Sequence, residues 1–231
     1  MKFQAKIKKE ELNGMPVASF EGEIVVIDKD SAVAAAIAEL SAQQVVGIDT
    51  ETKPSFNKGV HHQVALLQVA TNKICYLFRL NKISSESEAE KMIFKFLGNK
   101  NVMKIGLSLK DDFSRLHRLN IGNPANFIDL QIIAKQYGIL ELGLQKMFAI
   151  VFNKKISKAQ QLTNWENHTL SIAQQRYAAT DAWAALQIYQ RLTQEDKLPK
   201  PVVDRMVANA LAEQQEMSRQ NLLKFQAAKA T

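Results

Sequence analysis

The sequence is poor in the features that define several protein classes. Cys75 is its only cysteine in 231 residues, which leaves no internal disulfide and no cysteine-based zinc cluster. It has no run of about 18 apolar residues of the kind a membrane span needs, and its N-terminus lacks the apolar stretch of a signal peptide. We therefore expect a cytoplasmic protein with no membrane partner, in which Cys75 fills space in the core.

The sequence does contain enough apolar residues for a sizeable core, together with an excess of positive charge. Hydrophobic residues make up 46% of the chain, which suits one large or two small domains. Thirty Lys and Arg residues stand against 23 Asp and Glu, a formal net charge of +7. This balance favours a polyanionic partner, although composition alone does not identify one.

The order of the apolar patterns predicts an α/β domain. An Ala-rich segment at 31–42 reads as a helix that Ser31 would cap. Strand-like runs follow at 45–49, 63–70 and 73–78, the last two separated by a hairpin-like turn. Helix and strand patterns then alternate as far as a long helix at 169–192.

No Gly/Ser linker or internal repeat divides the chain, so we predict one main domain with an extension at each end. The predicted units are an N-terminal extension at 1–23, the main domain at 24–195 and a C-terminal helical extension at 196–231. Apolar residues of the last helix form a stripe at Val203, Met206, Val207, Leu211, Met217 and Leu222. We expect this stripe to pack back onto the domain; docking of a partner protein is the alternative.

Two carboxylates, Asp49 and Glu51, end the first strand-like run. In a strand they point to the same face, because side chains alternate with a period of two. Held that close, they repel each other unless one is protonated or a cation lies between them. Their hard oxygen atoms suit Mg²⁺ or Mn²⁺. The alternative is that one caps a turn while the other is solvated.

A second pair, Tyr177 and Asp181, lies four residues apart on the long helix and therefore on one face. The neighbouring positions carry small residues that would let this helix approach a sheet closely: Ala178, Ala179, Ala182 and Ala184. This would bring the Asp181 carboxylate and the Tyr177 hydroxyl near the sheet end. The alternative is an ordinary hydrogen bond on an exposed helix.

A third acidic motif, "GLSLKDDFSRL", places Asp111 and Asp112 where a strand ending in Gly106 turns into a helix. Apolar residues follow Asp112 at spacings that let the helix pack on one side while its carboxylate points elsewhere. Acidic residues also favour helix N-termini for electrostatic reasons alone. From the residues themselves, either aspartate could carry a function, or neither.

Taken together, these motifs resemble the DEDD superfamily of 3′-to-5′ exonucleases, in its Tyr-containing branch. "GIDTET" is similar to the first motif, "GLSLKDDFSRL" to the second and "NWENHTLSIAQQRYAATDAW" to the third. Within the branch, the chain looks most like the exonuclease domain of the Werner syndrome protein and, less closely, RNase D. The resemblance covers residues 24–192.

The resemblance implies an RNase H-like (DnaQ-like) α/β fold, with a mixed central sheet flanked by helices. It also implies a two-metal hydrolysis of phosphodiesters with two divalent ions, Mg²⁺ or Mn²⁺. By this resemblance the metal ligands are Asp49, Glu51, Asp112 and Asp181, with Asp112 preferred over Asp111. Tyr177 would orient the attacking water rather than bind metal.

The substrate implied is nucleic acid with a single-stranded or recessed 3′ end. The backbone at Thr52 would contact the terminal nucleotide, and Phe56 would stack on its base. His61 and His62 are expected to be loop residues rather than ligands, because the carboxylate set already suits hard metals. Likeness to Werner-type domains favours DNA. RNA processing and a nucleic-acid-binding module without catalysis remain alternatives.

Overall fold

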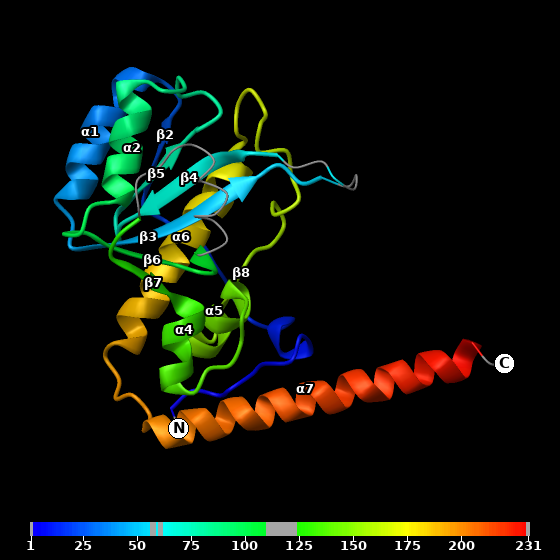
Figure 1. The fold of residues 1–231 in the computed structure, drawn as a ribbon. Helices are drawn as coiled ribbons and strands as arrows, with labels where there is room; N and C mark the ends of the chain where they lie inside the picture. The colour runs from blue at the N-terminus through cyan, green and yellow to red at the C-terminus, as the bar shows by residue number, and fades with distance from the viewer. Residues whose placement is uncertain (1, 56–58, 60–61, 110–123, 230–231) are drawn as a thin grey trace.

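The computed structural model describes residues 2–55, 59, 62–109 and 124–229. At its centre is a mixed six-stranded sheet in the order β2-β5-β4-β3-β6-β7 (Figure 1). The strands are β2 (Glu23–Ile27), β3 (Val45–Thr52), β4 (Val64–Ala70), β5 (Ile74–Phe78), β6 (Met103–Gly106) and β7 (Phe127–Asp129). β4 is antiparallel to both of its neighbours, and the remaining pairs are parallel. The predicted mixed α/β architecture is confirmed.

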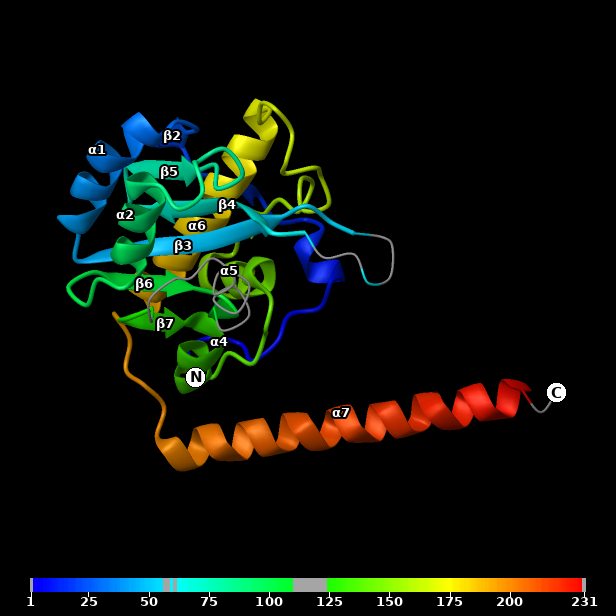
Figure 2. The same ribbon diagram turned by 45° about the horizontal axis from the view of Figure 1, so that its top comes forward.

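Helices cover both faces of the sheet (Figures 1 and 2). On one face lie α1 (Asp30–Ser41) and α2 (Glu88–Leu97), whose apolar residues share a core cluster with alternate residues of β3, β4 and β5. On the other face lies α6 (Ile172–Leu192), packed on the opposite set of residues in β4 and β5. The residues of β4 are buried throughout, as expected for a strand covered on both sides.

A third core cluster forms beyond β6, where the N-terminal residues meet the short helices. The elements there are η1 (Glu10–Leu12), β1 (Val17–Ala18), α4 (Leu130–Ile133), η3 (Ala134–Tyr137), α5 (Leu144–Phe152) and β8 (Lys155–Ile156). β1 and β8 pair as a small parallel sheet. Phe3, Ile7 and Leu12 are buried in this cluster, so the N-terminal segment contributes to the core.

The last helix, α7 (Lys200–Lys229), runs away from the domain (Figures 1 and 2). Its first turns pack near η3, where Val203 and Val207 are half-buried. Leu211 and Met217 are 54% and 61% exposed. The expectation that the whole apolar stripe packs back onto the domain is therefore wrong at Leu211 and Met217. Apolar spacing identifies an amphipathic face but does not specify what covers it.

Two local expectations had different outcomes. Cys75 is fully buried and burial raises the pKa of its thiol, as expected for a core residue. Ser31 does not cap its helix: α1 begins one residue earlier, at Asp30, and the carboxylate of Asp30 accepts a hydrogen bond from the backbone N–H of Ser84 at 3.0 Å.

Among the helices described, none is both long and apolar enough to cross a membrane.

Candidate active site

β3 carries Asp49 and Glu51 on the face of the sheet that α6 covers. The strand extends from Val45 to Thr52, three residues beyond its expected end, so both carboxylates lie within it. Beside Glu51, the pairing of β3 with β4 shifts by one residue, since Glu51 pairs with Leu66 but Thr52 pairs with Val64. Such a bulge increases the local twist and re-aims side chains, and it is common next to active sites.

Gly47 lets α6 approach the same strand very closely. A Cβ atom built on Gly47 would lie 1.9 Å from the carbonyl oxygen of Ala182, far inside van der Waals contact. Ala178, Ala179 and Ala182 are fully buried against the sheet, as the run of small residues predicted. Asp181, which precedes Ala182, is thereby held beside β3.

The close packing brings three carboxylates together. Ligand oxygens of Asp49, Glu51 and Asp181 all lie within 4.8 Å of one another. Tyr177 and Asp181 are each 8% exposed, and the tyrosine hydroxyl donates a hydrogen bond to the aspartate. The alternative of an exposed helical hydrogen bond is thus excluded, because the pair is buried against the sheet.

Burial is the main influence on the pKa values of Asp181 and Tyr177. Desolvation raises the pKa of Asp181 above its usual value, while the Tyr177 hydroxyl and the nearby Lys158 ammonium oppose this shift. Desolvation also raises the pKa of Tyr177, with a further contribution from Asp181. The phenol therefore keeps its proton at neutral pH and acts as a neutral hydrogen-bonding group.

These residues fit a hard divalent cation. Three carboxylate oxygens close enough to share one ion are the ligand type that Mg²⁺ and Mn²⁺ prefer. A cation would also remove the repulsion among the carboxylates and favour their charged forms.

A cavity of about 260 Å³ opens beside the cluster. Asp49, Tyr177 and Asp181 line one side, and the segment after β8 contributes Lys158 and Gln161. Sequence reasoning missed Lys158, because one lysine among 30 basic residues carries no signal until the fold brings it to Asp181. A cation at this position would attract a phosphate group entering the cavity.

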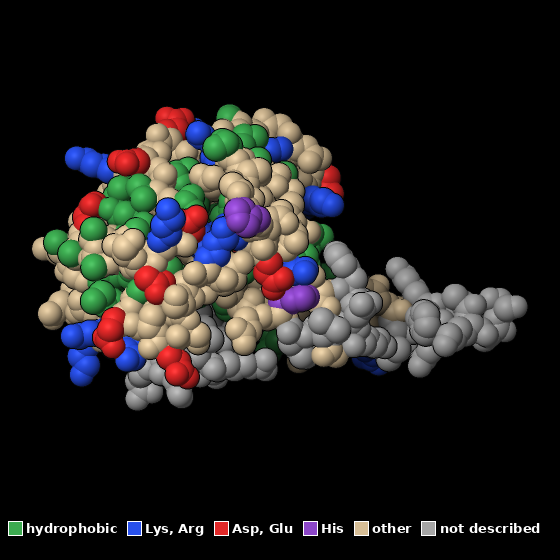
Figure 3. All heavy atoms as spheres, turned by 90° about the horizontal axis from the view of Figure 1, so that it is seen from above, with side chains coloured by type: hydrophobic (Ala, Val, Ile, Leu, Met, Phe, Trp, Pro, Cys, Tyr) green, Lys and Arg blue, Asp and Glu red, His purple; other side chains and the backbone are tan. Residues whose placement is uncertain are grey.

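The net positive charge does not gather into one patch on the face seen in Figure 3. On the face seen in Figure 3, Lys and Arg side chains are interspersed with Asp and Glu, and the residues coloured there form no continuous basic surface. On this face the charge of +7 does not mark a binding site, whereas Lys158 lies in the cavity beside the carboxylates.

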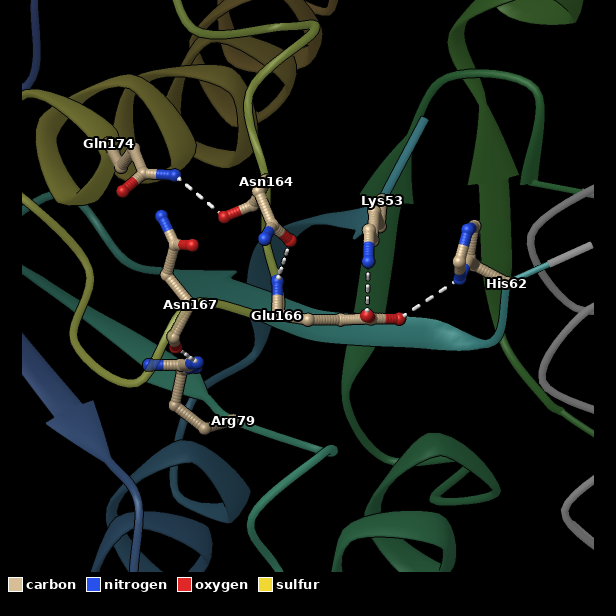
Figure 4. A network of polar contacts seen from close by, with 7 residues as sticks. All are labelled: Lys53, His62, Arg79, Asn164, Glu166, Asn167 and Gln174. Atoms are coloured by element: carbon tan, nitrogen blue, oxygen red, sulfur yellow. Dashed lines mark hydrogen bonds and ion pairs between the residues drawn. The ribbon is translucent and has the colours of Figure 1, made fainter. Parts of the chain in front are cut away.

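A polar network joins the ends of β3 and β4 to the loop that precedes α6 (Figure 4). The Glu166 carboxylate lies 3.2 Å from the ammonium of Lys53, just after β3, and 3.3 Å from the imidazole of His62, just before β4. On the other side, Gln174 in the first turn of α6 donates to the backbone carbonyl of Asn164 at 3.2 Å. The network thus ties the base of the β3–β4 hairpin to the start of the helix that carries Tyr177.

The structure says less about the other residues that were predicted to lie in or near the site. Asp111, Asp112, Phe56 and His61 lie outside the described residues. Thr52 is half-buried at the end of β3, and its role in substrate binding stays a prediction. His62 contacts Glu166, as a loop residue would.

Asp129 holds the chain that follows β6 in place. The Asp129 carboxylate accepts hydrogen bonds from the backbone N–H groups of Ser108, Leu109 and Gln131, at 3.2, 3.0 and 2.8 Å. It therefore caps α4 and fixes the chain just beyond β6 at the same time.

Comparison with known proteins places these observations in a family. Residues 24–197 match the family described as 3′-5′ exonuclease. The Mus musculus protein named bifunctional 3′-5′ exonuclease/ATP-dependent helicase WRN is 30% identical over 189 residues, covering 78% of this chain and 13% of that protein. The chain thus spans only a small part of that relative's length.

Two solved structures share the fold. The Nibbler EXO domain of Aedes aegypti has a TM-score of 0.69 at 22% identity, covering 82% of this chain and 99% of that one. RNase D of Trypanosoma brucei, solved in complex with RNA U12, has a TM-score of 0.67 at 17% identity, covering 82% and 70%. These likenesses confirm the fold implied by the motifs.

Proposed function

Because the chain belongs to the 3′-5′ exonuclease family, we propose that it is a metal-dependent nuclease that removes nucleotides from the 3′ end of nucleic acid. The observation that carries this proposal is the cluster of Asp49, Glu51 and Asp181, with the Tyr177 hydroxyl hydrogen-bonded to the buried Asp181. Three carboxylates this close repel one another, and burial disfavours the charged form of Asp181, so a bound cation would offset both costs.

The carboxylates would hold two divalent ions, Mg²⁺ or Mn²⁺. Asp49, Glu51 and Asp181 would contribute to the first and Asp49 to the second, with Asp112 completing the set. When bound, such ions supply a water of lowered pKa and neutralise charge developing on the phosphate.

The other polar residues of the cavity would position the substrate. Tyr177, kept protonated by its raised pKa, would orient the attacking water through its hydroxyl rather than remove a proton from it. Lys158 would bind a non-bridging phosphate oxygen and hold the terminal phosphodiester against the carboxylates. Thr52 and Phe56 would contact the last nucleotide.

The proposal favours DNA, on the resemblance to Werner-type domains. RNA is the second candidate, because a solved structure with the same fold carries RNA. The difference would depend on how the cavity receives the 2′ hydroxyl.

The test is a panel of DNA and RNA oligonucleotides labelled at the 5′ or the 3′ end, single-stranded or with recessed 3′ ends, incubated with Mg²⁺, Mn²⁺ or EDTA. Stepwise shortening from the 3′ end that requires metal supports the proposal, and the panel identifies the preferred substrate. If the protein binds the oligonucleotides but shortens none of them, it is a binding module and the proposal is wrong.

A further inference from the structure

Gln68, in the middle of β4, lies directly opposite Asp49 in the register of the antiparallel β3–β4 pair. Residues opposed in this way point to the same face of the sheet, with Cβ atoms about 4.5–5.5 Å apart. That face is the one covered by α6, where Leu66 and Ala70 flank Gln68 along the strand. Gln68 is therefore the side chain of β4 next to Asp49.

The amide of Gln68 is buried without hydrogen bonds. The residue is 0% exposed, and neither its Nε2 nor its Oε1 has a hydrogen-bond partner within the described part of the chain. A buried polar group left in this state costs about 1–3 kcal/mol. Such groups are few in native structures, and each one calls for an explanation, of which a role at a functional site is one.

Packing alone does not account for glutamine at this position. Methionine has nearly the same length and volume, and it would fill the space beneath α6 without an unsatisfied amide. The neighbours of Gln68 along this face of β4 are apolar, so an apolar side chain would suit its surroundings. Packing therefore does not require an amide here, and the polar group that Gln68 lies opposite is the Asp49 carboxylate.

We propose that Gln68 is a positioning residue for Asp49, its amide Nε2 donating a hydrogen bond to the Asp49 carboxylate when the site binds metal. This inference rests on the proposed function. Ligand carboxylates are commonly oriented by hydrogen bonds from residues behind them, and losing such a partner typically weakens metal binding about 10- to 100-fold. An amide suits the task because it directs the carboxylate without a positive charge that would compete with the metal.

The test compares wild type with Gln68→Met in two measurements: Mn²⁺ binding by titration calorimetry, and thermal unfolding in EDTA. Removing an unsatisfied buried amide should leave the melting temperature in EDTA equal to or above that of wild type. Mn²⁺ affinity should fall about 10- to 100-fold. A side chain that only packs would not give this combination of retained stability and weakened metal binding.

Lys104→Met is the matched control. Lys104 is also 0% exposed in a strand of the same sheet, but its ammonium donates to the carbonyl of Asn99 at 2.6 Å, away from the acidic cluster. Its replacement should leave Mn²⁺ affinity unchanged. Gln68→Leu serves as a second variant if Gln68→Met does not fold.

Unchanged Mn²⁺ affinity in a folded Gln68 variant would overturn the inference. So would a lower melting temperature with no change in affinity, because Gln68 would then be a packing residue. If wild type itself bound no Mn²⁺, the proposed function would be wrong. If wild type and its Gln68 variants bound Mn²⁺ equally tightly, only the inference about Gln68 would be wrong.

Discussion

Replacing Gly47 with alanine should disturb both the fold and the site, because α6 contacts β3 where the glycine lacks a side chain. The new Cβ would lie 1.9 Å from the Ala182 carbonyl oxygen and 3.0 Å from the Leu186 Cβ. The first distance is roughly 1.5 Å short of ordinary contact. Since the clashing atom belongs to the backbone, no rotamer change relieves it, and α6 has to move away from the strand.

The expected magnitudes follow from that displacement. Overpacking a core typically costs about 1–3 kcal/mol, and a clash with a helix backbone belongs at the upper end. For a chain of this length, about 3 kcal/mol lowers the melting temperature by roughly 6–12 °C. Asp181 moves together with Ala182, and a misplacement of about 1 Å in a catalytic group can reduce kcat about 100-fold.

The assay measures thermal unfolding and the rate of 3′-end shortening at saturating Mn²⁺, with Gly14→Ala as the control. A Cβ at Gly14 meets no atom within 4 Å, so this variant should match wild type in both measurements. If the melting temperature of Gly47→Ala stayed within about 2 °C of wild type and its kcat within about twofold, the claim that the close contact of α6 with β3 positions Asp181 would be wrong.

Three further predictions concern single side chains. Tyr177→Phe should remain folded but lose about tenfold to 100-fold in kcat, because the water loses its orienting hydroxyl; steady-state kinetics beside a melting curve would test this, and an unchanged kcat would contradict it. Lys158→Gln should raise KM and weaken the inhibition of shortening by added salt, since a phosphate contact is lost; equal salt dependence in both proteins would argue against the contact. Lys104 carries a pKa lowered by burial to about 8, against 10.5 for the free side chain. The unfolded chain therefore holds more protons between these values, so the unfolding free energy of wild type should rise from about pH 8 to about pH 10.5. Lys104→Met should remove that rise in denaturant titrations, and a rise that persists would contradict the assignment.

The parts of the site that could be predicted from sequence are those whose geometry is set within one element. Asp49 and Glu51 share a face because a strand alternates, and Tyr177 and Asp181 share a face because a helix turns every 3.6 residues. The run of small residues around Asp181 correctly indicated close packing on the sheet. These relations need no knowledge of the rest of the chain.

The residues that sequence reasoning missed depend on contacts between distant elements. Lys158 lies near Asp181 only because the segment after β8 borders the cavity, and Gln68 lies opposite Asp49 only through the register of two strands. Glu166 joins Lys53 across more than a hundred residues. Local patterns carry no information on such pairings.

The helix ends and the C-terminal helix show a different limit. Ser31 is a good capping residue by type, yet α1 begins at Asp30, where an acidic side chain suits the first turn electrostatically. For α7, the apolar spacing was read correctly as a helix, but Leu211 and Met217 are exposed. Periodicity predicts an element better than it predicts that element's neighbours.

The measurement that tests the central claim most directly is the loss of 3′ nucleotides from a 5′-labelled oligonucleotide by wild type, Asp49→Asn and Asp181→Asn, in Mn²⁺ and in EDTA. We expect wild type to act only with metal. Each folded variant should be slower by at least about 1,000-fold, because metal-bound groups supply several kcal/mol of the rate enhancement. Shortening by wild type in EDTA, or at an undiminished rate by either variant, would contradict the assignment of these carboxylates as the metal-binding active site.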